Sequence, residues 1–218
     1  MKLYHFLMEL LFPPKCVLCR QLLKKGEIDL CRACRTEAPE YPNRKIKLQF
    51  LDSFAAVWYY EGNVRSSLLR YKFRNARAYS VSYGRILAMK LLAQYPNGFD
   101  VLTWVPVSPL RKLRRGYDQV ELLAKAVGKE LGMTPVPTLK KIRNNRPQSR
   151  LKDPAARKAN VLGAYRMLDG ADVKGKRVLL LDDILTTGAT AGECARVLKT
   201  AGAKEVHCGA VAAANNLK

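Results

Sequence analysis

Apolar and polar residues follow one another along the chain in blocks that predict alternating strands and helices. Apolar runs with the length of a buried strand occur at 54–60, 100–106, 177–182 and 204–212. Shorter strand candidates occur near 135–139 and 161–166. Apolar residues recur with helical spacing at 64–74, 80–95, 117–131 and 190–201. Strands that alternate with amphipathic helices predict an α/β fold, in which helices cover both faces of a mostly parallel sheet.

The beginning of the chain does not share this pattern. Its first apolar stretch is interrupted by polar residues and ends at Pro13, which favours a short amphipathic helix over a signal peptide or a membrane span. Residues 35–50 have the proline-rich, basic composition of a linker. We therefore expect an N-terminal helix and cysteine module at 1–40 and an α/β domain at 50–218. No other segment has the hydropathy of a membrane span, which predicts a cytoplasmic protein.

Four of the six cysteines form two Cys-x-x-Cys pairs with eleven residues between them, namely Cys16, Cys19, Cys31 and Cys34. Two such pairs can bring four thiolates to the corners of a tetrahedron, which suits Zn(II). A disulfide pair or a redox-active motif is the alternative, which a cytoplasmic setting and the repetition of the motif disfavour. The module is either purely structural or also in contact with nucleic acid, because basic side chains surround it. Cys194 and Cys208 follow apolar patterns and are expected in the core.

The charge of the chain is strongly unbalanced. Lysine and arginine total 39 against 18 aspartates and glutamates, which gives a net charge of +21. Such an excess creates a long-range field that attracts polyanions, nucleic acid first, and this binding weakens steeply with salt. A basic surface that only aids solubility or matches an acidic partner protein is the alternative. With 48% of its residues apolar, the chain is neither disordered nor collagenous.

Residues with phosphate-binding chemistry follow the strand at 177–182. Asp182 and Asp183 emerge at its end, and the turn into the next helix contains Thr186, Thr187, Gly188, Ala189 and Thr190. Free N–H groups, the helix dipole and threonine hydroxyls bind phosphate at such a turn, and glycine lets the backbone approach the anion. The two carboxylates can accept hydrogen bonds from vicinal ribose hydroxyls. The segment therefore predicts a ribose 5-phosphate site; a purely structural strand–turn–helix is the alternative.

Two arginine-rich segments are expected near the same edge of the sheet. The segment at 105–119 contains Arg111, Arg114 and Arg115. The segment at 143–154 contains Arg143, Arg146 and Arg150. Arginine pairs with phosphate oxygens through two parallel hydrogen bonds, although a solvated basic helix entry would also explain the first segment. The polarity of the second segment predicts a mobile loop that closes over a ligand or follows a nucleic-acid backbone.

All thirteen positions from Val178 to Thr190 resemble the motif that binds phosphoribosyl pyrophosphate (PRPP) in type I phosphoribosyltransferases. The resemblance implies that Thr186–Thr190 hold the 5′-phosphate and that the two aspartates are catalytic residues that act on the ribose hydroxyls, often with Mg(II) nearby. It also implies that the segment at 105–119 contacts pyrophosphate. The segment at 143–154 matches the hood that closes over PRPP in this fold.

The order of motifs along nearly the whole chain resembles the ComF competence family. Its elements here are the double cysteine pair, Tyr60-Glu61-Gly62, Arg115-Gly116-Tyr117-Asp118-Gln119, Arg146-Pro147-Gln148 and the PRPP loop. One difference is Asp118, where the family typically has asparagine; it places a negative charge in the expected phosphate loop. The resemblance implies a role in natural transformation, in which the protein handles incoming single-stranded DNA beside a competence helicase and recombination-mediator proteins.

Three functions remain open from the sequence. In the first, the protein binds single-stranded DNA through Arg115, Arg143, Arg146 and Arg150 and reads nucleotide sugar-phosphates. Aromatic side chains that could stack bases if exposed are Trp58, Tyr59, Tyr60, Tyr71 and Phe73. In the second, it is an active phosphoribosyltransferase that holds PRPP with Mg(II) and transfers phosphoribose to a base or nucleotide. In the third, it senses PRPP or a nucleotide as an adaptor for a partner protein.

Overall fold

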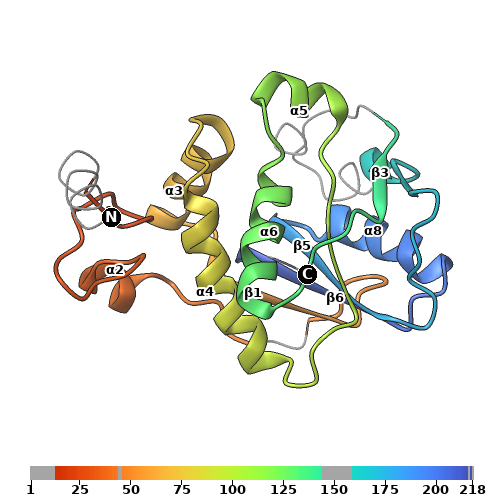
Figure 1. Ribbon diagram of the computed structural model, residues 1–218, viewed down its shortest axis with the longest axis horizontal. Helices are drawn as coiled ribbons and strands as arrows, with labels where there is room; N and C mark the ends of the chain where they lie inside the picture. Colours follow the sequence, from red (N-terminus) through yellow and green to blue (C-terminus); the bar gives the residue numbers. More distant parts are fainter. Residues whose placement is uncertain (1–12, 44–45, 144–158, 216, 218) are drawn as a thin grey trace, which may run out of the picture.

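The computed structural model describes residues 13–43, 46–143, 159–215 and 217. Figure 1 shows a central sheet with helices around it. The strands are β1 (Ser53–Tyr59), β2 (Val101–Trp104), β3 (Leu139–Lys141), β4 (Tyr165–Met167), β5 (Arg177–Leu185) and β6 (Glu205–Ala213). The helices are α2 (Arg32–Glu37), α3 (Gly62–Phe73), α4 (Tyr79–Gln94), α5 (Pro109–Arg115), α6 (Gln119–Leu131) and α8 (Ala189–Thr200). Within these ranges, no helix combines the length and the apolar character that crossing a membrane requires.

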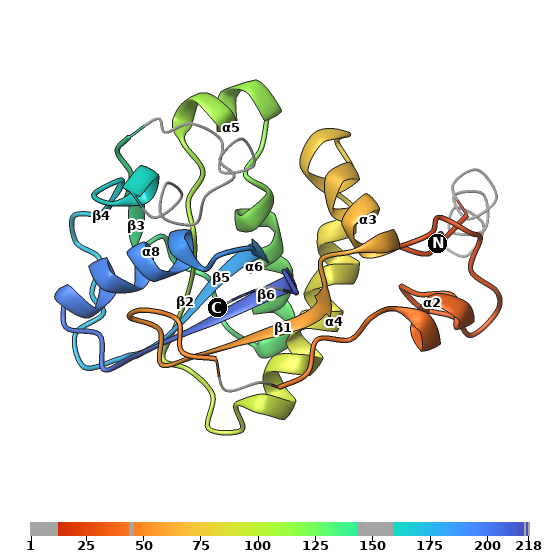
Figure 2. The ribbon, with the colours of Figure 1, turned by 180° about the vertical axis from the view of Figure 1, so that it is seen from behind.

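Four strands form one parallel sheet in the order β1-β6-β5-β2. Along β5, Leu179 and Leu181 pack in one core with side chains of α4 and α6, and Leu180 packs in a second core with side chains of α8. Figure 2 shows α8 on the face of the sheet opposite to α4 and α6. Cys194 and Cys208 are fully buried in the second core, as predicted. The sheet is thus covered on both faces, which explains the continuous apolar runs of its strands.

The two short strands depart from the prediction of a single sheet. β3 and β4 pair with each other in antiparallel register, with Lys141 opposite Tyr165, and form a separate two-stranded sheet. Only one residue of each strand is buried, Leu139 in β3 and Tyr165 in β4. A central parallel strand needs apolar residues on both faces, so these strands lie outside the main sheet, where β4 contacts α8.

The first arginine segment is also more regular than the loop that the sequence predicts. Residues Pro109–Arg115 form helix α5, which begins after Ser108 and ends at Gly116 with a left-handed φ of 74°. The Ser108 hydroxyl accepts a hydrogen bond from the Arg111 N–H at 3.4 Å. None of the residues of α5 is buried, so no apolar stripe marks this helix in the sequence.

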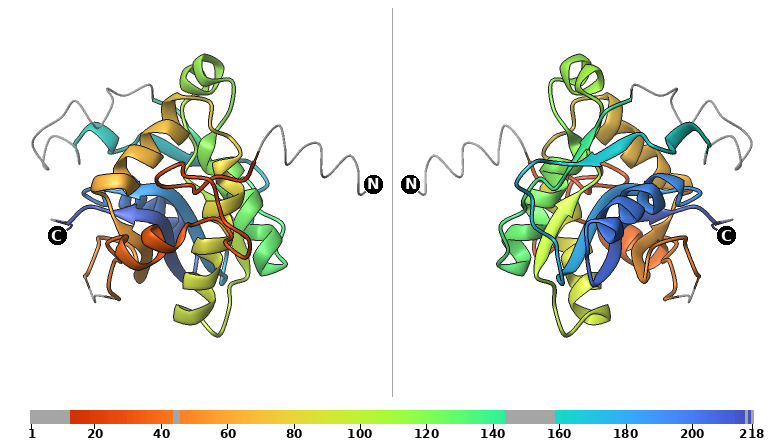
Figure 3. Two further views of the ribbon diagram at one scale, coloured as in Figure 1. Left: turned by 90° about the vertical axis from the view of Figure 1, so that its left-hand side faces the viewer. Right: turned by 90° about the vertical axis from the view of Figure 1, so that its right-hand side faces the viewer.

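The cysteine module, residues 13–37, packs against α3 and α4 at one end of the molecule (Figure 3). Val17 and Leu18 are each 1% exposed and belong to the core that contains the apolar side chains of these helices. The Ser67 hydroxyl donates a hydrogen bond to the Val17 carbonyl, and the Arg70 guanidinium donates to the Leu18 carbonyl at 2.5 Å. The module therefore shares a core with the α/β domain.

Candidate functional site

A cleft of about 820 Å³ lies at the carboxyl ends of β2 and β5, where ligands of parallel sheets bind. It is lined by every residue predicted for the ribose-phosphate site and the first arginine segment, which are Arg111, Arg114, Arg115, Asp182, Asp183, Thr186, Thr187, Gly188, Ala189 and Thr190. Further side chains come from α3, β3 and β4, including Lys72, Phe73, Lys141 and Tyr165. The structure thus brings together segments that are far apart in the sequence.

The turn after β5 has the geometry of an anion site. Gly188 is the N-cap of α8 and adopts a left-handed φ of 70°. A Cβ at this position would lie 2.9 Å from Leu48 Cδ2, so both the backbone conformation and the neighbouring side chain require glycine. Thr186 and Thr187 are half-buried. The N-terminus of α8 therefore opens into the cleft with hydroxyl groups beside it, the arrangement that favours a phosphate.

Strand β5 extends further than the sequence predicts. The aspartates do not stand beyond its end: they lie within the strand, which runs on to Leu185. Asp182 is opposite Ala210, and the pairing with β6 continues as far as Ala213. Because β6 offers backbone partners over this length, the strand does not end where its apolar run ends. Asp182 and Asp183 are consequently 9% and 3% exposed and line the cleft from its floor.

The two carboxylates have different surroundings. Asp183 Oδ1 lies 2.8 Å from Lys72 Nζ, and Asp183 Oδ2 accepts a hydrogen bond from the Gln119 amide at 3.1 Å. Asp182 accepts a hydrogen bond from the Asp183 N–H at 2.8 Å. Burial, and after it the charge of Asp183, raises the pKa of Asp182 to about 8. Lys72 is the cation beside this buried pair.

The arginines of α5 line the same cleft from a different element. Arg114 is exposed, whereas Arg111 and Arg115 are half-buried. Burial, and after it the charge of Arg115, lowers the pKa of Arg111. The Arg115 guanidinium donates a hydrogen bond to the Gln119 side chain at 2.8 Å and lies 5.0 Å from the centre of the Phe73 ring. Gln119 thus connects Arg115 with Asp183.

The sequence analysis does not identify three polar residues of the cleft as site residues. Lys72 and Lys141 stand in basic runs, where a lysine that pairs with a buried group looks the same as a solvated one. Gln119 begins an amphipathic helix, and the sequence analysis notes it only as the last residue of the family motif at 115–119. The Lys141 ammonium lies 3.1 Å from the Tyr165 hydroxyl, and burial, then the charge of Arg111, lowers the pKa of Lys141 to about 8. Their roles follow only from the tertiary structure.

Asp118 lies in the arginine segment at 105–119, but it does not line the cleft. It is 5% exposed and is the N-cap of α6, where its carboxylate accepts hydrogen bonds from the N–H groups of Val120 and Glu121 at 2.9 and 3.1 Å. A third hydrogen bond comes from the Val107 N–H at 3.2 Å. The side chain is therefore used for helix capping.

The aromatic candidates fall into three groups according to their exposure. Trp58 and Tyr71 are 3% and 0% exposed, so they belong to the core and cannot stack on a base. Tyr59 and Tyr60 are half-buried. Phe73 is 64% exposed at the end of α3 and lines the cleft. Of the five, Phe73 offers an accessible ring face beside the arginines.

The second arginine segment is only partly covered by the described residues. Arg143 is exposed, donates a hydrogen bond to the Leu162 carbonyl at 3.2 Å and does not line the cleft. Arg146 and Arg150 lie outside the described ranges, as does the predicted N-terminal helix. The role of this segment as a hood therefore stays a prediction.

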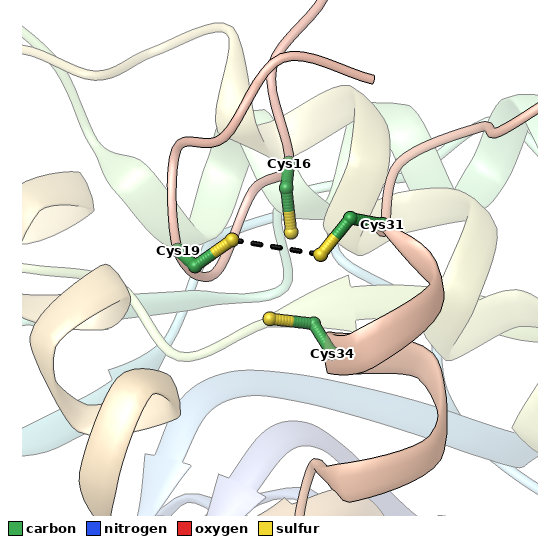
Figure 4. A group of neighbouring side chains, drawn as sticks. All are labelled: Cys16, Cys19, Cys31 and Cys34. Atoms are coloured by element: carbon green, nitrogen blue, oxygen red, sulfur yellow. Dashed lines mark hydrogen bonds between the residues drawn. The ribbon is translucent and has the colours of Figure 1, made fainter. Parts of the chain in front are cut away.

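The four paired cysteines converge on one point (Figure 4). Their sulfur atoms all lie within 4.8 Å of one another, and Cys19 Sγ and Cys31 Sγ are 3.6 Å apart. Zn–S bonds of about 2.3 Å in a tetrahedron give S···S edges of about 3.8 Å. Cys16 and Cys34 complete the set. The donor atoms and their spacing thus fit zinc, as the sequence predicts.

Comparisons with known proteins agree with this organisation. The double zinc ribbon domain family matches residues 7–45, and the phosphoribosyl transferase domain family matches residues 117–218.

Competence protein F of Haemophilus influenzae is 24% identical over 88% of this chain and 93% of its own length. Competence protein ComFC of Streptococcus pneumoniae is 32% identical over 71% of this chain and 65% of its own length. A solved structure of glutamine PRPP amidotransferase from B. subtilis is 23% identical, with a TM-score of 0.45, over 64% of this chain and 30% of that enzyme. The chain belongs to the ComF family, as a homologue of these competence proteins that joins a four-cysteine zinc-ribbon module to a type I phosphoribosyltransferase fold.

Proposed function

We propose that the chain handles single-stranded DNA in the cytoplasm during natural transformation and that its cleft binds the ribose 5-phosphate unit of PRPP or of a nucleotide. The observation that carries the proposal is the composition of the cleft, which unites a helix N-terminus, a buried aspartate pair and three arginines. A ribose 5-phosphate needs hydrogen-bond donors at its phosphate and acceptors at its vicinal diol, and the cleft supplies both. The names of the relatives and the net charge of +21 support the role in DNA handling.

Each part of the cleft has a task in this proposal. Thr186–Thr190 and the N-terminus of α8 hold the 5′-phosphate, and Asp182 and Asp183 accept hydrogen bonds from the ribose hydroxyls. The arginines of α5 bind the further phosphates of the ligand, with Mg(II) supplied together with PRPP to neutralise pyrophosphate. Because burial raises the pKa of Asp182, a cation bound beside it would favour the loss of its proton. In the cysteine module, the four thiolates would hold Zn(II) and thereby stabilise a segment with little core of its own.

A strand of DNA would extend from the cleft across α3 and α5. Phe73 presents an exposed ring that Arg115 already approaches from one side. A base can stack on such a ring while the arginine contacts the adjacent phosphate. Arg143, Arg146 and Arg150 would follow the backbone further along. A competence helicase and recombination-mediator proteins are the partners that would deliver and receive the strand.

Calorimetric titration with PRPP in the presence of Mg(II) tests the small-ligand part. We expect wild-type protein to bind, and Asp183→Asn to bind about tenfold more weakly, the effect of losing about 1.5 kcal/mol from a charge-assisted hydrogen bond. Arg196→Gln is the matched control, because Arg196 lies on α8 and pairs with Glu193 outside the cleft. If PRPP and nucleotides do not bind the wild-type protein, the assignment of the cleft is wrong.

Fluorescence anisotropy with 5′-phosphorylated single-stranded DNA at near-physiological salt tests the DNA part. We expect binding that unlabelled duplex does not displace, and weaker binding by Arg115→Gln but not by Arg196→Gln. A salt-sensitive association that duplex displaces equally well would mean that the positive charge attracts any polyanion. That outcome would refute the role in handling single strands.

An active phosphoribosyltransferase is the second candidate. It is favoured by the presence of arginines and a carboxylate pair in one cleft, which would stabilise departing pyrophosphate and position the ribose while a base attacks. Release of pyrophosphate from PRPP that requires a base or nucleotide acceptor, and that is lost in Asp183→Asn, would support catalysis. PRPP binding without release across a panel of acceptors would leave binding as the function.

A further inference from the structure

Lys141 is a cleft residue whose position suits a nucleophile. It is the last residue of β3 and stands opposite Tyr165 of β4. Its Nζ lies 3.1 Å from the Tyr165 hydroxyl and 5.0 Å from the centre of the same ring. Tyr165 itself is 3% exposed. The amine is thus held in the cleft by a hydrogen bond to a phenol, instead of by a carboxylate that would fix it as an ammonium.

The surroundings of Lys141 favour the neutral amine. Burial, and after it the charge of Arg111, lowers the pKa of Lys141 to about 8, against smaller opposing effects of Cys194 and Asp182. A far larger fraction of Lys141 than of an ordinary lysine therefore carries a neutral amine near neutral pH. An ammonium can bind phosphate, but only the free amine can attack a carbonyl carbon. The phosphate-binding groups of the cleft are already present at the N-terminus of α8 and on α5.

We propose that Lys141 forms a Schiff base with the C1 aldehyde of a pentose 5-phosphate bound in the cleft, with the Tyr165 hydroxyl as proton relay. This inference rests on the proposed function, because the phosphate site must hold the sugar. A pentose 5-phosphate whose C1 carries a free hydroxyl group opens to an aldehyde. The Lys141 Nζ lone pair attacks C1, and a proton moves from nitrogen to oxygen to give a carbinolamine. The carbinolamine loses water as Tyr165 passes a proton to the departing oxygen and takes one back from the nitrogen. Amine and aldehyde thus become imine and water, and hydrolysis reverses the step.

Two sources can supply this aldehyde. One is free ribose 5-phosphate, and the other is the 5′-terminal deoxyribose phosphate that remains when a DNA end loses its base. Both present an aldehyde form of a 5-phosphorylated pentose, so the chemistry at Lys141 is the same. A protein that handles single strands would meet the second source whenever an end is damaged.

Borohydride trapping of the full chain tests the proposal. After incubation with ribose 5-phosphate and reduction, peptide mapping should find one reduced pentose phosphate on Lys141. Lys141→Arg should abolish the label, and Tyr165→Phe should slow it. Lys140→Arg should retain it, because Lys140 is the adjacent residue of β3 and pairs with Asp169 instead of lining the cleft. The labelling rate should rise with pH through 8, since the neutral amine reacts.

Further experiments distinguish the two sources of the aldehyde, and the Schiff base from the proposed function. If DNA ends are the substrate, a DNA oligonucleotide with a 5′-deoxyribose phosphate should give, after borohydride reduction, a covalent complex that survives denaturing electrophoresis. If only the free sugar labels Lys141, free ribose 5-phosphate is the substrate. Calorimetric binding of ribose 5-phosphate is measured in parallel. Binding without label on Lys141, or label spread evenly over exposed lysines, would overturn the Schiff base while the cleft assignment stands. Absence of both binding and label would overturn both.

Discussion

Lys72 is the cation that balances the buried aspartate pair, so its removal tests the electrostatics of the cleft. Lys72→Met keeps the stem of the side chain and removes the charge. Across the 2.8 Å between Nζ and the Asp183 carboxylate, the attraction is about 6 kcal/mol at an effective dielectric constant of about 20. The lysine side chain is 21% exposed, and water compensates part of the loss, which leaves about 2–3 kcal/mol. We expect the free energy of unfolding to fall by this amount at pH 8.5.

The loss should depend on pH, because protons can replace part of the missing charge. Burial raises the pKa of Asp182 to about 8, so the carboxylate pair already holds a proton at pH 6. With fewer negative charges to balance, removal of Lys72 costs less at this pH, about 1 kcal/mol. The expected signature is thus a destabilisation that grows as pH rises from 6 to 8.5.

Urea denaturation at the two pH values measures this signature. Lys112→Met is the control, because Lys112 forms a surface pair with Glu121 at 3.0 Å and its side chain is 57% exposed, which predicts a cost below about 0.5 kcal/mol. The double variant Lys72→Met/Asp183→Asn should recover most of the loss, since it removes the unpaired charge. The reasoning fails if Lys72→Met costs no more than Lys112→Met at pH 8.5, or if its cost is the same at both pH values.

Three further predictions concern the turn, Asp182 and a helix cap. Gly188→Ala forces alanine into a left-handed φ of 70° and places its Cβ 2.9 Å from Leu48. We therefore expect the free energy of unfolding to fall by about 1–3 kcal/mol and Leu48→Ala to restore part of it. A wild-type melting temperature for Gly188→Ala would contradict this. A carboxyl group with a raised pKa stabilises the folded state at acid pH and loses that contribution as pH rises through its folded value, here about 8. Asp182→Asn should therefore gain stability relative to wild type between pH 6 and 8, by up to about 1.4 kcal/mol per pH unit, and parallel curves in urea denaturation would count against it. Asp118→Ala removes a helix cap that accepts hydrogen bonds from two N–H groups of α6. Thermal denaturation should show a free energy of unfolding lower by about 1 kcal/mol for Asp118→Ala and close to wild type for Asp118→Asn. Equal losses in both variants would argue against capping.

The features of the fold that the sequence predicts are those whose signal is local. The apolar runs of β5 and β6 and the spacing of α6 each report burial within one element. The turn at Thr186–Thr190 and the cysteine pairs are local as well, because their functional groups lie within a few residues of one another. For this reason the α/β class and the four-cysteine cluster are confirmed, and the turn at Thr186–Thr190 lies between β5 and α8, where the sequence places it, while its role in phosphate binding stays a prediction.

The features that the sequence does not predict depend on partners far along the chain. The extension of β5 needs β6 beside it, and the pairing of Lys141 with Tyr165 joins segments separated by the second arginine segment. Helix α5 has start and stop signals in Ser108 and Gly116, but without a buried residue its periodicity is absent. Lys72 differs from a solvated lysine only because folding brings it to Asp183. No spacing rule along the chain encodes these contacts.

Helix α3 connects the two chemical centres of the molecule. Ser67 and Arg70 donate hydrogen bonds to carbonyls of the cysteine module, and Lys72, on the following turn, pairs with Asp183 in the cleft. Both sets of contacts depend on the placement of this one helix. We therefore expect that a ligand which favours this placement from the cleft raises the affinity of the four cysteines for a metal by the same factor. Resistance of the cysteine module to a chelator would then report, from a distance, on the binding of a ligand in the cleft.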